Sequence, residues 1–202
     1  MNMNLVVVAG IAVVIIGLVA AFAIAGNGGD KSDSTTDEQS PSFGSAAVVY
    51  FSESGNTEGI ARKIADVTGG ELIRIVPTVE YTSADLDYGN SGCRSKVEDL
   101  DSSARPGISN DMDLGKYNVV FLGYPIWYGD SPKIMWTFVE THDLSGKTIV
   151  PFCTSGSSGV GSSDDHLKAL TDKGTWLDGK RFPASASQKD VESWVNGLGV
   201  AA

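Results

Sequence analysis

Residues 48–57 read VVYFSESGNT, and the fold of the whole chain can be worked out from this stretch. Apolar and aromatic residues stop at Ser52, where hydroxyl residues, Gly55 and an asparagine follow. Apolar residues then recur with the spacing of one helix face until a glycine pair at 69–70 ends the pattern. The stretch predicts a buried strand over 46–51, a short polar loop, and a helix that begins just after Gly55.

Similar units follow along the rest of the chain. Two more buried strands are predicted from nearly continuous apolar runs at 118–123 and 148–153, and an edge strand from the alternating pattern at 71–76. Further helices are predicted over 131–141, 164–171 and 188–197. A short last strand is expected near Trp176 or near 181–182, whereas 78–110 is long, polar and only partly helical. This alternation predicts an α/β fold of βαβ units on a parallel sheet.

The composition divides the chain into three parts. Residues 1–25 contain an apolar run, 5–25, which as a helix is about 32 Å long and can span a bilayer. It predicts a transmembrane anchor or a cleaved signal segment, because residues 23–25 (AIA) have the small-x-small pattern of a cleavage site. Residues 26–45 are rich in Gly, Ser, Thr and Asp and predict a flexible polar linker. Residues 46–202 have the size of one domain.

Charge and cysteine content exclude some classes of function. When Lys31 and the four acids of the linker are set aside, the domain keeps 14 basic and 21 acidic residues, a formal charge of −7. Such an acidic domain argues against a nucleic-acid partner. Cys93 and Cys153 are too few for a disulfide framework, and we expect two free thiols.

Three loops follow the strands at 46–51, 118–123 and 148–153, and in an open parallel sheet these loops meet at one edge. The first, SESGNT, offers hydroxyls and backbone N–H groups at a helix start, which suits an anion. A polyphosphate site would need a P-loop lysine that is missing here, so a single terminal phosphate fits better. A plain helix N-cap is the simpler alternative.

The other two loops suggest the remainder of a ligand. The loop GYPIWYGDSP brings Tyr124, Trp127 and Tyr128 into one turn, which can offer a flat wall to a planar ring or simply cover the core. The loop TSGSSGVGSS exposes backbone polar groups, or is only a flexible linker. Taken together, the loops call for a phosphate, a planar aromatic body and a hydrogen-bonding edge, the three parts of flavin mononucleotide (FMN).

The motifs FSESGNT, GYPIWYGDSP and VPFCTSGSSGVGSS, in this order, resemble the flavodoxin family, in particular a bacterial branch. The resemblance implies a doubly wound sandwich with a five-stranded sheet in the order 2-1-3-4-5 and noncovalent FMN. It also implies a set of FMN-binding residues: Ser52, Ser54, Gly55, Asn56 and Thr57 for the phosphate, Pro125, Ile126, Trp127, Tyr128 and Gly129 for the isoalloxazine, and Thr154, Ser155 and Gly156 for the pyrimidine side and ribityl chain. The third loop has no aromatic residue, unlike many flavodoxins, so one flavin face is expected to be more open.

The function implied by the resemblance is electron transfer through the semiquinone and hydroquinone states of FMN. Backbone groups in 125–129 are expected to accept a hydrogen bond from reduced N5–H, and nearby acids such as Glu53 and Asp130 to lower the reduction potential. The acidic surface predicts a redox partner with a basic docking face. With residues 5–25 as a single anchor, we expect the protein to be located at the bacterial cell membrane with its domain outside. Secretion after signal cleavage is the alternative.

Other functions stay open as alternatives. An FMN-dependent NAD(P)H:quinone-type reductase fits the open flavin face, although no nicotinamide fingerprint is present. A phosphoacceptor domain shares this kind of fold, but Tyr124 and Pro125 stand where its aspartate belongs. A binding module without redox activity is a third possibility. His142 and His166 are isolated in the sequence, so neither is expected to be catalytic. No metal site is expected from the sequence either.

Overall fold

The computed structural model describes residues 44–200, so the predictions for residues 1–25 and for nearly all of the linker lie outside the described residues. The described chain alternates strands and helices in the predicted way. Within 44–200, no helix is both long and apolar enough to cross a membrane. The elements are β1 (Ala46–Tyr50), α1 (Asn56–Thr68), β2 (Glu71–Arg74), α2 (Arg94–Leu100), β3 (Val119–Pro125), α3 (Lys133–Thr141), β4 (Thr148–Thr154), α4 (Ser163–Ala169), β5 (Thr175–Trp176), β6 (Lys180–Phe182) and α5 (Gln188–Gly197).

One parallel sheet forms the centre of the domain, with strands in the order β2-β1-β3-β4-β5, and this order was predicted correctly. β3 lies in the middle and pairs with β1 on one side and with β4 on the other. β2 is the edge strand expected from its alternating pattern. Because all pairs are parallel, the loops that follow β1, β3 and β4 leave the sheet at the same edge.

The outer position beside β4 is shared by two short strands, so the sheet has six strands rather than the predicted five. β5 pairs with the start of β4 and β6 with its end. Along β4, the Thr148 N–H donates toward the β3 side, whereas the Ile149 carbonyl accepts from the outer side. By this alternation the backbone groups of Pro151 point to the outer side of β4, where proline has no N–H to donate. The pairing is therefore interrupted at Pro151, and the outer strand is split there.

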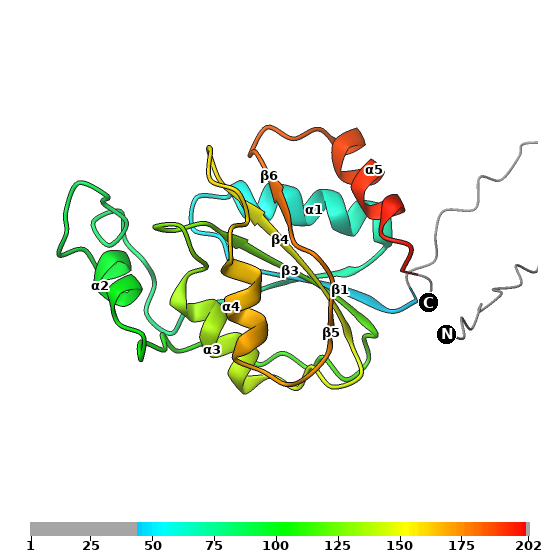
Figure 1. Ribbon diagram of the computed structural model, residues 1–202, viewed down its shortest axis with the longest axis horizontal. Coiled ribbons are helices and arrows are strands. Elements are labelled where there is room, and N and C mark those ends of the chain that lie inside the picture. Colours follow the sequence, from blue (N-terminus) through cyan, green and yellow to red (C-terminus); the bar gives the residue numbers. More distant parts are fainter. Residues whose placement is uncertain (1–43, 201–202) are drawn as a thin grey trace, which may run out of the picture. The chain divides into compact units, whose positions relative to one another are not determined.

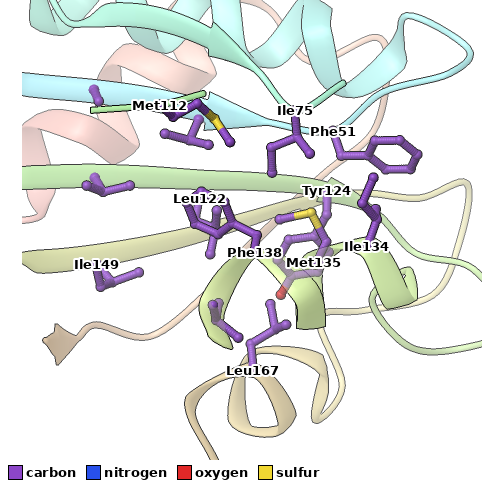
Figure 2. Packing of buried hydrophobic residues seen from close by; sticks show 14 of the residues in the cluster. Phe51, Ile75, Met112, Leu122, Tyr124, Ile134, Met135, Phe138, Ile149 and Leu167 are labelled. Carbon is purple, nitrogen blue, oxygen red and sulfur yellow. The ribbon is translucent and has the colours of Figure 1, made fainter. Parts of the chain in front are cut away.

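Helices cover both faces of the sheet, as Figure 1 shows, with α1 and α5 on one side and α3 and α4 on the other. Alternate strand residues supply the two cores. Leu122, Phe138 and Ile149 belong to the cluster under α3 and α4, whose packing is drawn in Figure 2. Ile60 of α1 and Val195 of α5 belong to the opposite cluster. Two buried faces explain why the central strands are apolar throughout.

Residues 75–118, which we call the excursion, leave the sheet after β2 and return before β3. The side chain of Asn110 closes its base, because it accepts from the Val76 N–H and donates to the Arg74 carbonyl, both at 2.9 Å. Between these ends only α2 is regular, and Figure 1 shows it set apart from the sheet. The segment is therefore partly helical, as its polar sequence predicted.

Candidate functional site

A cleft of about 580 Å³ opens at the edge of the sheet where the three loops were predicted to meet. Eight of the predicted site residues line it: Ser54, Asn56, Pro125, Ile126, Trp127, Thr154, Ser155 and Gly156. The cleft therefore draws residues from all three loops, although about a hundred residues separate the first loop from the third.

The first loop forms a seat for an anion at the start of α1. Gly55 lies directly before the helix with φ 80°, a left-handed conformation that costs glycine little. The amides of the first helical turn have no acceptor within the helix and carry the positive end of its dipole. Ser52 is 4% exposed, and its Oγ has no hydrogen-bond partner within the described residues. A buried hydroxyl in this state fits a ligand oxygen, because burial without a partner is costly.

Thr57 joins the first loop to the third. Its buried Oγ1 lies 2.8 Å from Oγ1 of Thr154, at the end of β4. Thr57 does not line the cleft, so its hydroxyl supports the site from behind. The bond fixes the spacing between the anion seat and the third loop.

The second loop is a tight turn. Trp127 and Asp130 exchange backbone hydrogen bonds of 2.9 and 3.0 Å, while Tyr128 and Gly129 between them have φ of 52° and 92°. Two successive positive φ values define a type I′ turn, which is strained at a residue such as tyrosine. Trp127 lines the cleft and also makes edge contacts with Phe51 at 5.5 Å, so it is both a cleft wall and a cover for the core.

The side chain of Tyr128 contacts the excursion and is not part of the cleft lining. Its ring lies 4.6 Å from that of Tyr88, with Lys96 Nζ 4.3 Å from its centroid. Its hydroxyl lies 3.1 Å from Ser95 Oγ and 3.4 Å from Cys93 Sγ. The excursion thus holds the one non-glycine residue in positive φ within the described chain.

The third loop is fixed by Arg181 of β6. The guanidinium donates to the carbonyls of Ser155 and Gly156, at 2.7 and 2.8 Å, and to Ser155 Oγ at 3.2 Å. The Ser155 hydroxyl also donates to the Ser158 carbonyl. These contacts make the glycine- and serine-rich loop a defined wall of the cleft.

Six cleft-lining residues were missed as binding residues from the sequence: Glu53, Leu86, Tyr88, Pro183, Ala184 and Ser185. Leu86 and Tyr88 come from the excursion, and Tyr88 is 60% exposed at the rim. An aromatic residue in a polar loop was the available signal for Tyr88. The residues at 183–185 follow β6, whose position could not be predicted while the outer strand was uncertain.

Several ionisable groups lie at or near the cleft. Burial raises the pKa of Glu53, against the opposing effect of Arg74. Hydrogen bonds from Ser95 and Tyr128 lower the pKa of Cys93, and burial raises that of Cys153 to about 12. Both cysteines are free, as expected, and both are buried.

The two histidines are less isolated than their sequence positions suggested. His166 Nδ1 lies 2.7 Å from Asp130 Oδ2, so α4 is joined to the aromatic turn. His142 stacks on Phe138, and its Nδ1 lies 3.0 Å from the Phe138 carbonyl.

An open parallel sheet, helices on both faces, and a cleft with an anion seat and an aromatic wall define a nucleotide-binding α/β protein of the doubly wound class. The flavodoxin family model matches residues 45–198. The chain therefore belongs to the flavodoxin family. No curated protein matches it significantly.

Solved structures agree with the family assignment. A protein described as a flavoprotein from Bacteroides eggerthii is 41% identical, with a TM-score of 0.72 over 76% of this chain and 97% of that chain. One from Bacteroides uniformis is 37% identical, with a TM-score of 0.72 over 75% and 97%. A Lactobacillus acidophilus flavoprotein in complex with FMN is 20% identical, with a TM-score of 0.55 over 75% and 98%, which supports the fold alone.

Proposed function

We propose that the domain binds FMN in this cleft and acts as an electron-transfer protein held at a membrane by residues 5–25. The convergence of the three loops on one cleft, in a member of the flavodoxin family, is the observation that carries the proposal. When bound, FMN supplies reversible transfer of one or two electrons. The protein's own residues bind it, orient it and set the energy of its reduced forms.

The phosphate of FMN belongs in the first loop. The free Oγ of buried Ser52 would donate to a phosphate oxygen, together with amides at the start of α1. Ser54 and Asn56 line the cleft. Thr57 contributes by fixing the first loop to the third.

The aromatic turn and the third loop would hold the isoalloxazine. Trp127 would offer its ring, Ile126 an aliphatic surface, and the backbone of the turn hydrogen-bond acceptors for the ring edge. Tyr88 at the rim extends the wall on the excursion side, whereas the open flavin face was predicted from the lack of an aromatic residue in the third loop.

Charge around the cleft favours a low reduction potential. Glu53 lines it, and Asp130 closes the aromatic turn. Negative groups raise the energy of the anionic reduced ring, which lowers the potential. The net acidic domain favours a protein partner with a basic docking face.

The membrane location rests on the sequence of residues 5–25, with the domain outside the bacterial cell. N-terminal sequencing of the mature protein distinguishes a retained anchor from secretion after cleavage. A mature chain that begins near residue 26 in the medium would contradict the membrane proposal.

Purification of the protein with its visible spectrum recorded tests the central proposal. We expect a yellow protein that releases FMN on denaturation, and a colourless protein that does not bind added FMN would contradict it. Turnover of NADH or NADPH with a quinone, without a partner protein, would favour the reductase alternative over electron transfer.

A further inference from the structure

Three buried polar side-chain atoms without hydrogen-bond partners lie near the carboxyl ends of β1 and β2, and one of them belongs to the cleft-lining Glu53. Within the described residues, four buried side-chain nitrogen or oxygen atoms have no hydrogen-bond partner. Three of them are Ser52 Oγ, Glu53 Oε1 and Arg74 Nε, at or just after the carboxyl ends of β1 and β2. Burying such atoms without partners is costly, and a ligand oxygen that reached Ser52 Oγ and Arg74 would remove that cost.

Arg74 lies on the strand next to the first loop and contacts Glu53 of that loop. It is the last residue of β2 and pairs in register with Tyr50, two residues before Ser52. Its Nη2 lies 3.5 Å from Glu53 Oε1, a distance too long for a strong hydrogen bond. Arg74 Nε therefore has no acceptor within the described residues, and Nη2 has only a weak one.

Glu53 makes this cation necessary. Its side chain is 9% exposed and lines the cleft, so its charge lies beside any phosphate in the seat. Glu80 and Arg94 of the excursion are the other charged groups that act on it, and their charges oppose each other. Without a nearby positive charge, a carboxylate and a phosphate would repel each other in a partly buried site.

We infer that Arg74 is the counter-cation of the phosphate seat, donating to a phosphate monoester while Glu53 orients its guanidinium. This inference rests on the proposed FMN site and adds a charged residue to a seat that the sequence predicted to have none. Arg74 then provides selectivity for FMN over riboflavin, which lacks the phosphate. Arg74 can stabilise the ligand through charge-assisted hydrogen bonds, the stronger kind.

Binding of FMN and riboflavin to the full-length protein, by fluorescence titration, tests this role. We expect Arg74→Gln to weaken FMN binding about tenfold, with riboflavin binding unchanged. Glu53→Gln should strengthen FMN binding about threefold, because it removes a repelling charge. Arg74→Lys keeps the charge but loses the planar fork, and should fall between wild type and Arg74→Gln.

Arg62→Gln is the matched control. Arg62 is an exposed α1 residue paired with Glu58, and its loss changes the net charge by the same amount. We expect the ratio of FMN to riboflavin affinity to stay at its wild-type value in this variant.

A purely structural ion pair would give another pattern. Arg74→Gln and Glu53→Gln would then weaken binding of both flavins alike, and that result, or no change in either flavin, would overturn the inference. If the wild type binds no FMN, the proposed function fails, and the anion seat is then judged by thermal stabilisation with inorganic phosphate. Stabilisation that is lost in Arg74→Gln but kept in Arg62→Gln supports Arg74, and equal stabilisation in all three overturns its role.

Discussion

The sheet with its helices and the excursion differ in how much of their surface is buried. Central strand residues such as Val49, Val120 and Ile149 are fully buried between two layers of helices. The excursion places Ile75, Met112 and Leu114 in the same core. It also makes polar contacts, such as Tyr81 with Glu98 at 2.6 Å and the pair of Arg105 with Glu140 of α3. It also carries all of the exposed large hydrophobic residues of the described chain: Val79, Tyr88, Val97 and Leu100.

The sheet and the excursion contribute differently to the site. The sheet fixes where the three loops leave, through the register of β1, β3 and β4. The excursion adds one wall of the cleft and holds Tyr128 of the aromatic turn. Hydrophobic burial of the sheet therefore determines where the site is, and the aromatic and polar contacts of the excursion shape one of its walls.

The largest expected difference between the regions is in unfolding free energy. Phe138→Ala empties space in the core of Figure 2 and should cost about 3–5 kcal/mol. Leu100→Ala, on the excursion, removes a side chain that is 73% exposed and should cost less than about 0.5 kcal/mol. Urea denaturation measures both values. Comparable losses in the two variants would mean that the excursion has a hydrophobic core of its own.

The same contrast explains what could be predicted from the sequence. Apolar runs determined β1, β3 and β4, and the glycines at 55 and 69 determined the ends of α1, because burial and positive φ leave clear signals. Pro151 was visible in the sequence, but its effect on the outer strand depends on which side of β4 it faces.

The site was only partly predictable for a related reason. Tyr88 and Leu86 reach the cleft through contacts between segments far apart in sequence, such as Tyr88 with Tyr128. No local pattern encodes such contacts. The Tyr128 side chain likewise turns to the excursion because of partners that follow β2, which the loop sequence alone does not specify.

The second prediction compares the two cysteines at high pH. Cys153 lies in β4 with its pKa raised to about 12, so between pH 9 and 12 the thiol ionises in the unfolded chain first. The contribution of Cys153 to the unfolding free energy is fully present below pH 9. It falls by about 1.4 kcal/mol per pH unit as the pH rises towards 12. Cys153→Ser should flatten this fall, measured as the unfolding free energy against pH.

Cys93 of the excursion should act in the opposite direction. Hydrogen bonds lower its pKa in the folded state, so its contribution to stability is present above pH 9 and is lost as pH falls through the folded pKa. Cys93→Ser should therefore remove a rise in unfolding free energy as the pH approaches 9 from below, and leave the fall between pH 9 and 12 unchanged. A flatter fall between pH 9 and 12 in Cys93→Ser, like the one expected for Cys153→Ser, would contradict the opposite environments of the two thiols.

A smaller effect is expected at the joint between the first and third loops. Thr57→Val keeps the shape of the side chain but leaves the buried Thr154 hydroxyl without its partner, at a cost of about 1–2 kcal/mol. The double variant Thr57→Val with Thr154→Val should cost less than the sum of the two single variants. Thermal unfolding without ligand measures the coupling, and strict additivity would show that the 2.8 Å contact does not stabilise the site.

The smallest expected effect is at the contact between the excursion and the aromatic turn. Tyr128→Phe keeps the ring against Tyr88 and removes the hydroxyl that lies 3.1 Å from Ser95 Oγ. Ser95→Ala removes the other partner, and a double-mutant cycle should give a coupling of about 0.5–1 kcal/mol in unfolding free energy.

The same four proteins can be compared in their affinity for FMN. Because Tyr128 is strained at φ 52°, loosening its hydroxyl lets the turn relax, so both single variants should weaken FMN binding by similar factors. Coupling in stability without any change in FMN affinity would mean that the excursion braces the turn but does not shape the cofactor site.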